Sequence, residues 1–228
     1  MQPENYHAVL NERGTVLIEP GQRRVAEVMS ALAASLGTPV PGRRGAGTIE
    51  CLKPLAPNAA KLNSLSRVHG IGLFPLHTDG AHWEIPPRYI LLSSVGQDTR
   101  RGTSVIDGRA VLSRMTSDEV GLVRRGVVVT RSGRRSQLVS IVNERGFLRF
   151  DRGCMIPASL SGRDSMRIMS NMLDKEIVTR VGWEKSSILI IDNWRCVHGR
   201  EPAPVGGDDD RSLLRITVAD ASQEAQWG

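Results

Sequence analysis

His77 and Asp79 stand one residue apart in the segment His77-Thr78-Asp79. In extended backbone alternate side chains point to the same side, so this imidazole and this carboxylate can converge on one metal ion. His198 is the candidate third ligand, because it follows the apolar run 188–192 after a short polar stretch, at a rim position where catalytic groups collect. Two neutral imidazoles and one carboxylate leave three octahedral positions open, which suits Fe(II) with a bidentate cosubstrate and O₂.

A strand-like segment at residues 211–218 carries two arginines that could hold an anion. Strand alternation places Arg211 and Arg215 on the same face. Four residues of strand span about 13 Å, so one small carboxylate does not reach both arginines and we expect them to divide the work. An arginine that faces the inside of a barrel needs an anion as its partner. The alternative is an edge strand whose arginines are solvated beside the acidic run at 208–210.

Four segments in order resemble the taurine dioxygenase and clavaminate synthase-like family of Fe(II)/2-oxoglutarate-dependent oxygenases. They are FPLHTDGAHWEIPPRYILL, RRGTSVIDG, ILIIDNWRCVHGREPAP and DDRSLLRITV, and they extend from about residue 74 to residue 218. Four ordered segments are far more specific than a single His-x-Asp pattern. The resemblance implies a double-stranded β-helix, which is a jelly roll with helices packed on one outer face.

The resemblance also implies roles for the residues at matching positions. It implies that iron is ligated by His77, Asp79 and His198. It implies that Arg211, thirteen residues after His198, holds the distal carboxylate of 2-oxoglutarate, and that the hydroxyl of Thr103 assists. The family reaction implies bound Fe(II), 2-oxoglutarate and O₂ as cosubstrates, and release of succinate and CO₂.

The prime substrate would meet further residues. Arg215 matches a family position that often faces this substrate, and the other candidates flank the metal ligands: His69, His82, Trp83 and Trp194. A structural histidine and plain packing of the indoles are the alternative roles for these four. An arginine-rich mouth predicts a small anionic or amino-acid-like substrate, and hydroxylation of an unactivated C–H bond is the default reaction.

The elements that position these residues are predicted from periodicity. Apolar residues three and four apart, followed by Gly37, predict a helix over about 22–36. A capping-box pattern at Ser161 and Asp164 predicts the start of a second helix, which methionines at core-facing spacing continue to Ile177. Short β-branched or alternating runs predict strands at 89–93, 104–108, 126–130, 137–142, 146–150, 188–191 and 211–218, with a hairpin within 126–150.

Many short strands with a few helices indicate a mainly β fold with flanking helices, a sandwich or a jelly-roll (cupin-like) barrel. With 228 residues, 40% of them apolar, the chain can form one domain over 1–228, with the jelly-roll core at about 74–218. No apolar run approaches the roughly 20 residues of a membrane span, and the N-terminus lacks a secretory signal, so we expect a cytoplasmic protein. The three widely spaced cysteines are expected to be reduced thiols.

The net charge and the number of aromatic residues indicate which kind of molecule the protein binds. The chain has 30 Lys plus Arg against 24 Asp plus Glu, but the 4 Trp, 2 Tyr and 3 Phe are few for base stacking. We therefore expect a small-molecule substrate, no membrane partner and no nucleic acid. Two rival interpretations stay open: a basic metal-binding or nucleic-acid-binding module with a vestigial site, and a cupin-like oxygenase that does not use 2-oxoglutarate. The sequence assigns neither the prime substrate, nor the carbon attacked, nor the oligomeric state.

Overall fold

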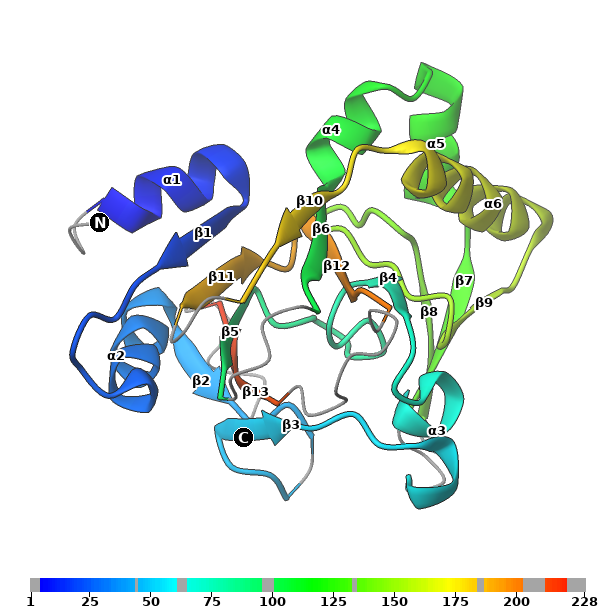
Figure 1. Cartoon of the computed structure of the whole chain (residues 1–228). Helices are drawn as coiled ribbons and strands as arrows, with labels where there is room; N and C mark the ends of the chain where they lie inside the picture. The colour runs from blue at the N-terminus through cyan, green and yellow to red at the C-terminus, as the bar shows by residue number, and fades with distance from the viewer. Residues whose placement is uncertain are drawn as a thin grey trace.

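The structure of the chain is a computed structural model that describes residues 5–43, 45–60, 65–95, 101–132, 135–183, 187–202 and 212–220. Within these residues the strands form three sheets, of six, four and three strands, and helices lie at two sides of the molecule (Figure 1). The fold is therefore mainly β with flanking helices, as the sequence predicts.

The largest sheet contains the most deeply buried strands. Its order is β1 (Thr15–Ile18), β11 (Ile188–Asp192), β5 (Tyr89–Ser94), β13 (Leu213–Ala219) and β2 (Thr38–Val40), and β3 (Ile49–Leu52) also pairs with β13. Every residue of β5 and β11 is buried. Strands that are covered on both faces carry continuous apolar runs, which explains the uninterrupted hydrophobic character of these two segments.

Alternate side chains of the largest sheet enter two different cores. One set, which includes Leu91 and Ile190, packs against α1 (Tyr6–Arg13) and α2 (Val25–Leu36). The other set, which includes Ile90 and Leu189, packs against the second sheet. Figure 1 shows α1 and α2 beside β1, β11 and β2. The helix predicted over 22–36 is confirmed as α2, which begins at Val25 and ends before Gly37.

The second sheet has the order β10 (Thr179–Val181), β6 (Thr103–Asp107), β12 (Cys196–Arg200) and β4 (Phe74–His77). The chain passes from β11 in the largest sheet to β12 in this sheet through a turn at residues 193–195. In β12, His198 lies opposite Val105 on one side and opposite His77 on the other. The strand register thus brings the two predicted histidine ligands side by side.

A third, smaller sheet supports the remaining helices. Its order is β8 (Arg135–Val139), β7 (Val128–Ser132) and β9 (Met155–Pro157), and it packs with α5 (Ser117–Arg125) and α6 (Leu160–Lys175). Met169 of α6 is fully buried in this core, with Met166 and Met172 packed against it, so the methionine spacing serves core packing as predicted. The short helical elements are α3 (Leu65–His69), α4 (Gly108–Ser113) and the 3₁₀ helix at Pro57–Ala59.

The structure corrects several predicted boundaries. The side chain of Ser159, and not that of Ser161, caps α6 by accepting a hydrogen bond from the Gly162 N–H, and the helix ends before the exposed Ile177. The hairpin predicted within 126–150 is confirmed and is formed by β7 and β8, but residues 146–150, predicted as a strand, contribute only an isolated bridge. The helices α1 and α5 were not predicted. Helix α1 buries only Tyr6 and Leu10 and lacks a clear apolar face, and α5 is short, with Val123 as its one buried side chain.

Two further expectations concern thiols and membranes. Cys51, Cys154 and Cys196 are all free, as predicted from their number and spacing. None of the helices in the described part of the chain has the length and hydropathy needed to cross a bilayer.

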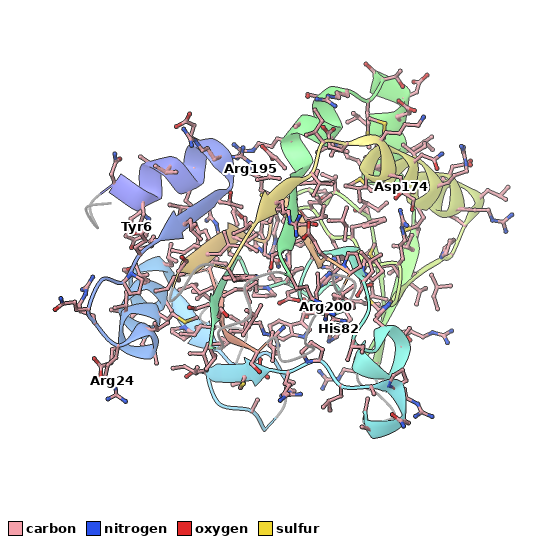
Figure 2. All side chains as sticks on the ribbon, viewed as in Figure 1. Tyr6, Arg24, His82, Asp174, Arg195 and Arg200 are labelled. Carbon is pink, nitrogen blue, oxygen red and sulfur yellow. The ribbon has the colours of Figure 1, made fainter. Side chains whose placement is uncertain are left out.

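Arg195, in the turn between β11 and β12, ties the N-terminal helix to the second sheet. Its guanidinium donates to both carboxylate oxygens of Asp107 and to the carbonyl oxygens of Asn11 and Glu12 in α1. Figure 2 shows Arg195 between α1 and the strands of this sheet. The contacts also satisfy carbonyl groups that the end of a helix leaves without an intrahelical partner.

Arg195→Gln is expected to lower the free energy of unfolding by about 2–3 kcal/mol, because glutamine leaves Asp107 without its cation and the α1 carbonyls without their donors. Urea unfolding measures the change. Arg24→Gln is the control, since it removes only an exposed ion pair with Glu27 and should change stability by less than about 0.5 kcal/mol. Wild-type stability in Arg195→Gln would contradict the role assigned to this arginine.

Candidate metal centre

Three potential metal ligands meet at the edge of the second sheet. His77 ends β4, Asp79 follows in a turn, and His198 lies in β12. One ligand atom from each residue lies within 4.8 Å of the others. Nε2 of His77 is 3.2 Å from Oδ1 of Asp79, and Nε2 of His198 is 4.0 Å from the same oxygen. The structure thus brings together the three residues that the sequence predicts as ligands.

The backbone conformation that positions Asp79 differs from the predicted one. The prediction assumed extended backbone through residues 77–79, but the strand ends at His77 and Asp79 lies in a turn. Gly80 follows with φ +66°, in the left-handed region that favours glycine, and an added Cβ there would lie 2.6 Å from Cδ of Pro87. A tight turn, and not strand alternation, therefore positions the Asp79 carboxylate.

The three donors fit a divalent first-row metal ion. Nδ1 of His77 is 2.9 Å from the carbonyl oxygen of Pro75, so we assign a ring proton to Nδ1, and Nε2, which faces Asp79, is the nitrogen that would bind a metal ion. His77 and His198 are each only 6% exposed. Two imidazole nitrogens and one carboxylate oxygen, held together away from water, form the donor set of a facial triad.

Burial and neighbouring charges shift the pKa values of the ligand side chains in opposite directions. Burial raises the pKa of Asp79, but Arg215 and the two histidines outweigh burial and hold this pKa well below its ordinary range. Burial lowers the pKa of His198 to about 3, and His77 adds to the shift. Burial also lowers the pKa of His77, but Asp79 outweighs it and the net shift is upward. At neutral pH the carboxylate is therefore ionised, and His198 is a neutral imidazole able to bind a cation.

Arg215 of β13 holds the second oxygen of Asp79. Its Nη1 donates to Oδ2 of Asp79 at 2.9 Å, while Nη2 and Nε donate to Oε2 of Glu50 at 2.6 and 3.2 Å. Glu50 lies directly opposite Arg215 in the register of β3 and β13 and is 4% exposed. Arg43 contributes a second ion pair to Glu50, at 2.9 Å. The buried carboxylate of Glu50 and the partly buried carboxylate of Asp79 thus share the Arg215 cation. A contact of Arg215 with the prime substrate stays a prediction.

Of the two residues predicted to bind 2-oxoglutarate, Thr103 lies within the described part of the chain. Thr103 begins β6 and is 2% exposed. It lies two residues before Val105, the partner of His198, so strand alternation places Thr103 on the sheet face that carries His198. Arg211 lies outside the described residues, and its role stays a prediction.

His69 and His82 lie near the metal donors. The ring of His69 contacts Phe74 edge to face, with centroids 4.7 Å apart, and Phe74 contacts His77 in the same way at 4.3 Å. Burial lowers the pKa of both His69 and His82, and the charge of Asp151 opposes the shift in each. Direct contact of either histidine with substrate stays a prediction.

The two predicted tryptophans take part in local packing. Trp194 donates from Nε1 to the carbonyl oxygen of Pro86 at 2.8 Å, and its ring lies against Phe147 with centroids 5.3 Å apart. The carbonyl oxygen of Trp83 accepts a hydrogen bond from Arg149 at 2.7 Å. These contacts agree with the packing alternative, and substrate contacts of the two indoles stay predictions.

Three arginines near the donors bind the protein itself. Arg149 is 2% exposed and donates to the carbonyl oxygens of Ala81, Trp83 and Glu84. Arg200 donates to the carbonyl oxygens of Gly70 and Gly72, and Arg215 is held by carboxylates. The expectation of an arginine-rich mouth that selects an anionic substrate therefore receives no support from these three residues.

Three residues around the site were not predicted from the sequence. In β3 the charged Glu50 is buried while its apolar neighbour Ile49 is 37% exposed. This is the opposite of the usual apolar-inside arrangement, so the strand carries no sequence pattern that predicts a buried Glu50. Asn193 binds the backbone of Asp79, and the polar pair Asp192-Asn193 at the end of a buried strand was the available signal. Asp151 follows Phe150, which is hydrogen-bonded to Thr78 between two of the ligands.

Comparisons with known proteins give relatives but no match to a family model. The chain is 25% identical over 187 residues to an L-lysine 3-hydroxylase from Catenulispora acidiphila, an alignment that covers 74% of this chain and 52% of the relative. The chain thus spans about half the length of that curated relative.

Two solved structures share the fold. One is asparagine oxygenase in complex with Fe(II), 2S,3S-3-hydroxyasparagine and succinate, with a TM-score of 0.73 and 19% identity over 93% of this chain and 77% of that chain. The other is the non-heme iron oxygenase OrfP in complex with Fe, succinate and (3S)-hydroxy-L-Arg, with a TM-score of 0.75 and 18% identity over 99% of this chain and 82% of that chain. Together with the curated relative, they confirm the resemblance of this chain to the taurine dioxygenase and clavaminate synthase-like family of Fe(II)/2-oxoglutarate-dependent oxygenases.

Proposed function

We propose that the protein is an Fe(II)/2-oxoglutarate-dependent oxygenase that hydroxylates an unactivated C–H bond of a small amino-acid substrate. The observation that carries this proposal is the cluster of two buried histidines, His77 and His198, with the partly buried Asp79, whose ligand atoms lie within 4.8 Å of one another. The relatives support the reaction type, since one is named a hydroxylase and OrfP has been solved with Fe and alpha-ketoglutaric acid.

Each residue has a distinct task in this proposal. His77, Asp79 and His198 hold Fe(II), while Arg211 and Thr103 bind the far carboxylate of 2-oxoglutarate. When bound, iron, 2-oxoglutarate and O₂ supply the oxidising chemistry, with release of succinate and CO₂. The protein supplies orientation, because paired strands fix the two imidazoles and a buried cation keeps the third ligand ionised.

We also propose that the two larger sheets are the halves of a double-stranded β-helix, within one domain over residues 1–228 and with the jelly-roll core at about 74–218. The direct step from β11 in one sheet to β12 in the other supports this arrangement. The apolar core between the sheets, which joins β5 and β11 to β6 and β12, supports it as well.

An amino acid is the substrate class that the surroundings of the site favour. The relatives are named for lysine, or were solved with hydroxylated asparagine or arginine. Asp151 is half-buried, and its charge acts on His69, His77 and His82. A carboxylate at this place suits a substrate with an ammonium group, which every amino acid carries.

Anaerobic addition of Fe(II) and 2-oxoglutarate to the purified protein is expected to produce the weak visible charge-transfer band of a chelated keto acid. The band should saturate with 2-oxoglutarate in the wild type. It should need more 2-oxoglutarate in Arg211→Ala, which removes the cation for the far carboxylate, and it should be absent from His77→Ala, which loses an iron ligand.

The same samples separate the rival functions. Bound iron without a band would contradict the use of 2-oxoglutarate and favour a cupin-like oxygenase. Failure of the wild type to bind iron would favour the binding-module interpretation. After admission of air, succinate release that depends on L-lysine, L-arginine or L-asparagine would identify the amino acid that the site accepts.

Arg215→Leu is expected to lower the free energy of unfolding of the metal-free protein by about 3–5 kcal/mol, because it leaves buried carboxylates without their shared cation. Glu50→Leu combined with Arg215→Leu should cost less than the sum of the two single changes, since both members of one pair are removed together. Urea unfolding of the wild type, the two single variants and the double variant measures this coupling. Additivity within about 0.5 kcal/mol would show that Glu50 and Arg215 act independently.

A further inference from the structure

The third ligand differs from the other two in how its backbone is held. His77 and His198 lie on paired strands, and each is the other's partner in the ladder. Asp79 lies in a turn beyond the end of β4, where no strand pairs with it. Something else must fix the backbone of this residue, because a side chain is only as well placed as the backbone that carries it.

The carboxamide of Asn193 binds both backbone polar groups of Asp79. Its Oδ1 accepts a hydrogen bond from the Asp79 N–H at 2.8 Å, and its Nδ2 donates to the Asp79 carbonyl oxygen at 2.9 Å. Nδ2 also donates to the carbonyl oxygen of Pro87, at 2.8 Å. Asn193 is fully buried, and its own N–H donates to the carbonyl oxygen of Arg88 at 2.7 Å. One side chain thus replaces the strand partner that Asp79 lacks and joins Asp79 to Pro87, at the two ends of the segment 79–87.

The contact pattern requires a carboxamide of this length. It uses one acceptor and two donor hydrogens, which is what the amide group of asparagine or glutamine offers. A carboxylate at the same place would face the carbonyl oxygens of Asp79 and Pro87 with acceptors only. Glutamine is longer by one methylene and would have to displace groups in a fully buried site.

We infer that Asn193 is a positioning residue, which fixes the backbone of Asp79 so that its carboxylate stands ready for the metal ion before the ion binds. The inference rests on the proposed function, because it assumes that Asp79 is a ligand. Groups that orient a metal ligand strongly affect metal affinity although they never touch the metal.

The test compares metal binding by the apoproteins of the wild type and Asn193→Asp. Asparagine to aspartate keeps the size of the side chain, replaces the NH₂ group with an oxygen that has no donor hydrogens, and adds an ionisable charge, which the control variant below adds as well. Co(II) is the probe, with affinity measured by calorimetry and ligand geometry by the visible ligand-field bands. Asn143→Asp is the matched control, since the Asn143 side chain, within the described part of the chain, uses its Oδ1, which accepts from the Phe147 N–H at 3.0 Å, and aspartate retains that oxygen.

Asn193→Asp is expected to bind Co(II) about 10- to 100-fold more weakly than the wild type, with altered ligand-field bands, while Asn143→Asp binds normally. Circular dichroism and thermal unfolding show whether each variant is folded. If Asn193→Asp does not fold, Asn193→Ser, which keeps a single hydroxyl donor, takes its place with the same expectation. Wild-type affinity and bands in the folded variant would overturn the inference. Failure of the wild type itself to bind Co(II) would overturn the proposed metal site and the inference with it.

Discussion

The burial of an ionised carboxylate beside two imidazoles is the constraint on which the rest of the site depends. A charge moved out of water is strongly unfavourable unless it is paired and hydrogen-bonded. Asp79 meets this condition through Arg215, which Glu50 holds in turn from the neighbouring strand. The largest sheet therefore supplies the compensating charge, and the second sheet supplies the two imidazoles. The site needs both sheets in their observed arrangement, and either sheet alone would leave part of it without a partner.

The sequence predicts the ligands but not the residues that support them. His77, Asp79 and His198 were recognised because metal ligation demands particular residue types, and four ordered segments gave those types a context. Helix α2 was recognised because its buried face repeats with the helical period. Glu50 and Arg215, in contrast, are 165 positions apart, and Asn193 and Asp79 are 114 apart. Contacts over such separations are fixed by sheet order and register, which local patterns do not contain.

Backbone around the ligands is held by buried polar side chains. Arg149 binds three carbonyl groups just after the metal-ligand turn, and Thr78 exchanges hydrogen bonds with Phe150 between two of the ligands. These side chains bind the backbone of the protein itself, so they stabilise a fixed geometry around the ligands. Binding costs free energy when it must order flexible groups, and a preformed geometry reduces this cost. The reduction matters for a site that must orient a metal, a cosubstrate and a substrate together.

The proposed site requires that His77, Asp79 and His198 bind one metal ion. A crystal structure of the protein grown with Fe(II) under anaerobic conditions, with data collected at the iron absorption edge, tests this requirement. We expect one anomalous difference peak, bonded to the two imidazoles and to one oxygen of Asp79 while Arg215 keeps its contact with the other. Iron-loaded crystals with no peak among these three side chains, or with the peak on other residues, would contradict it.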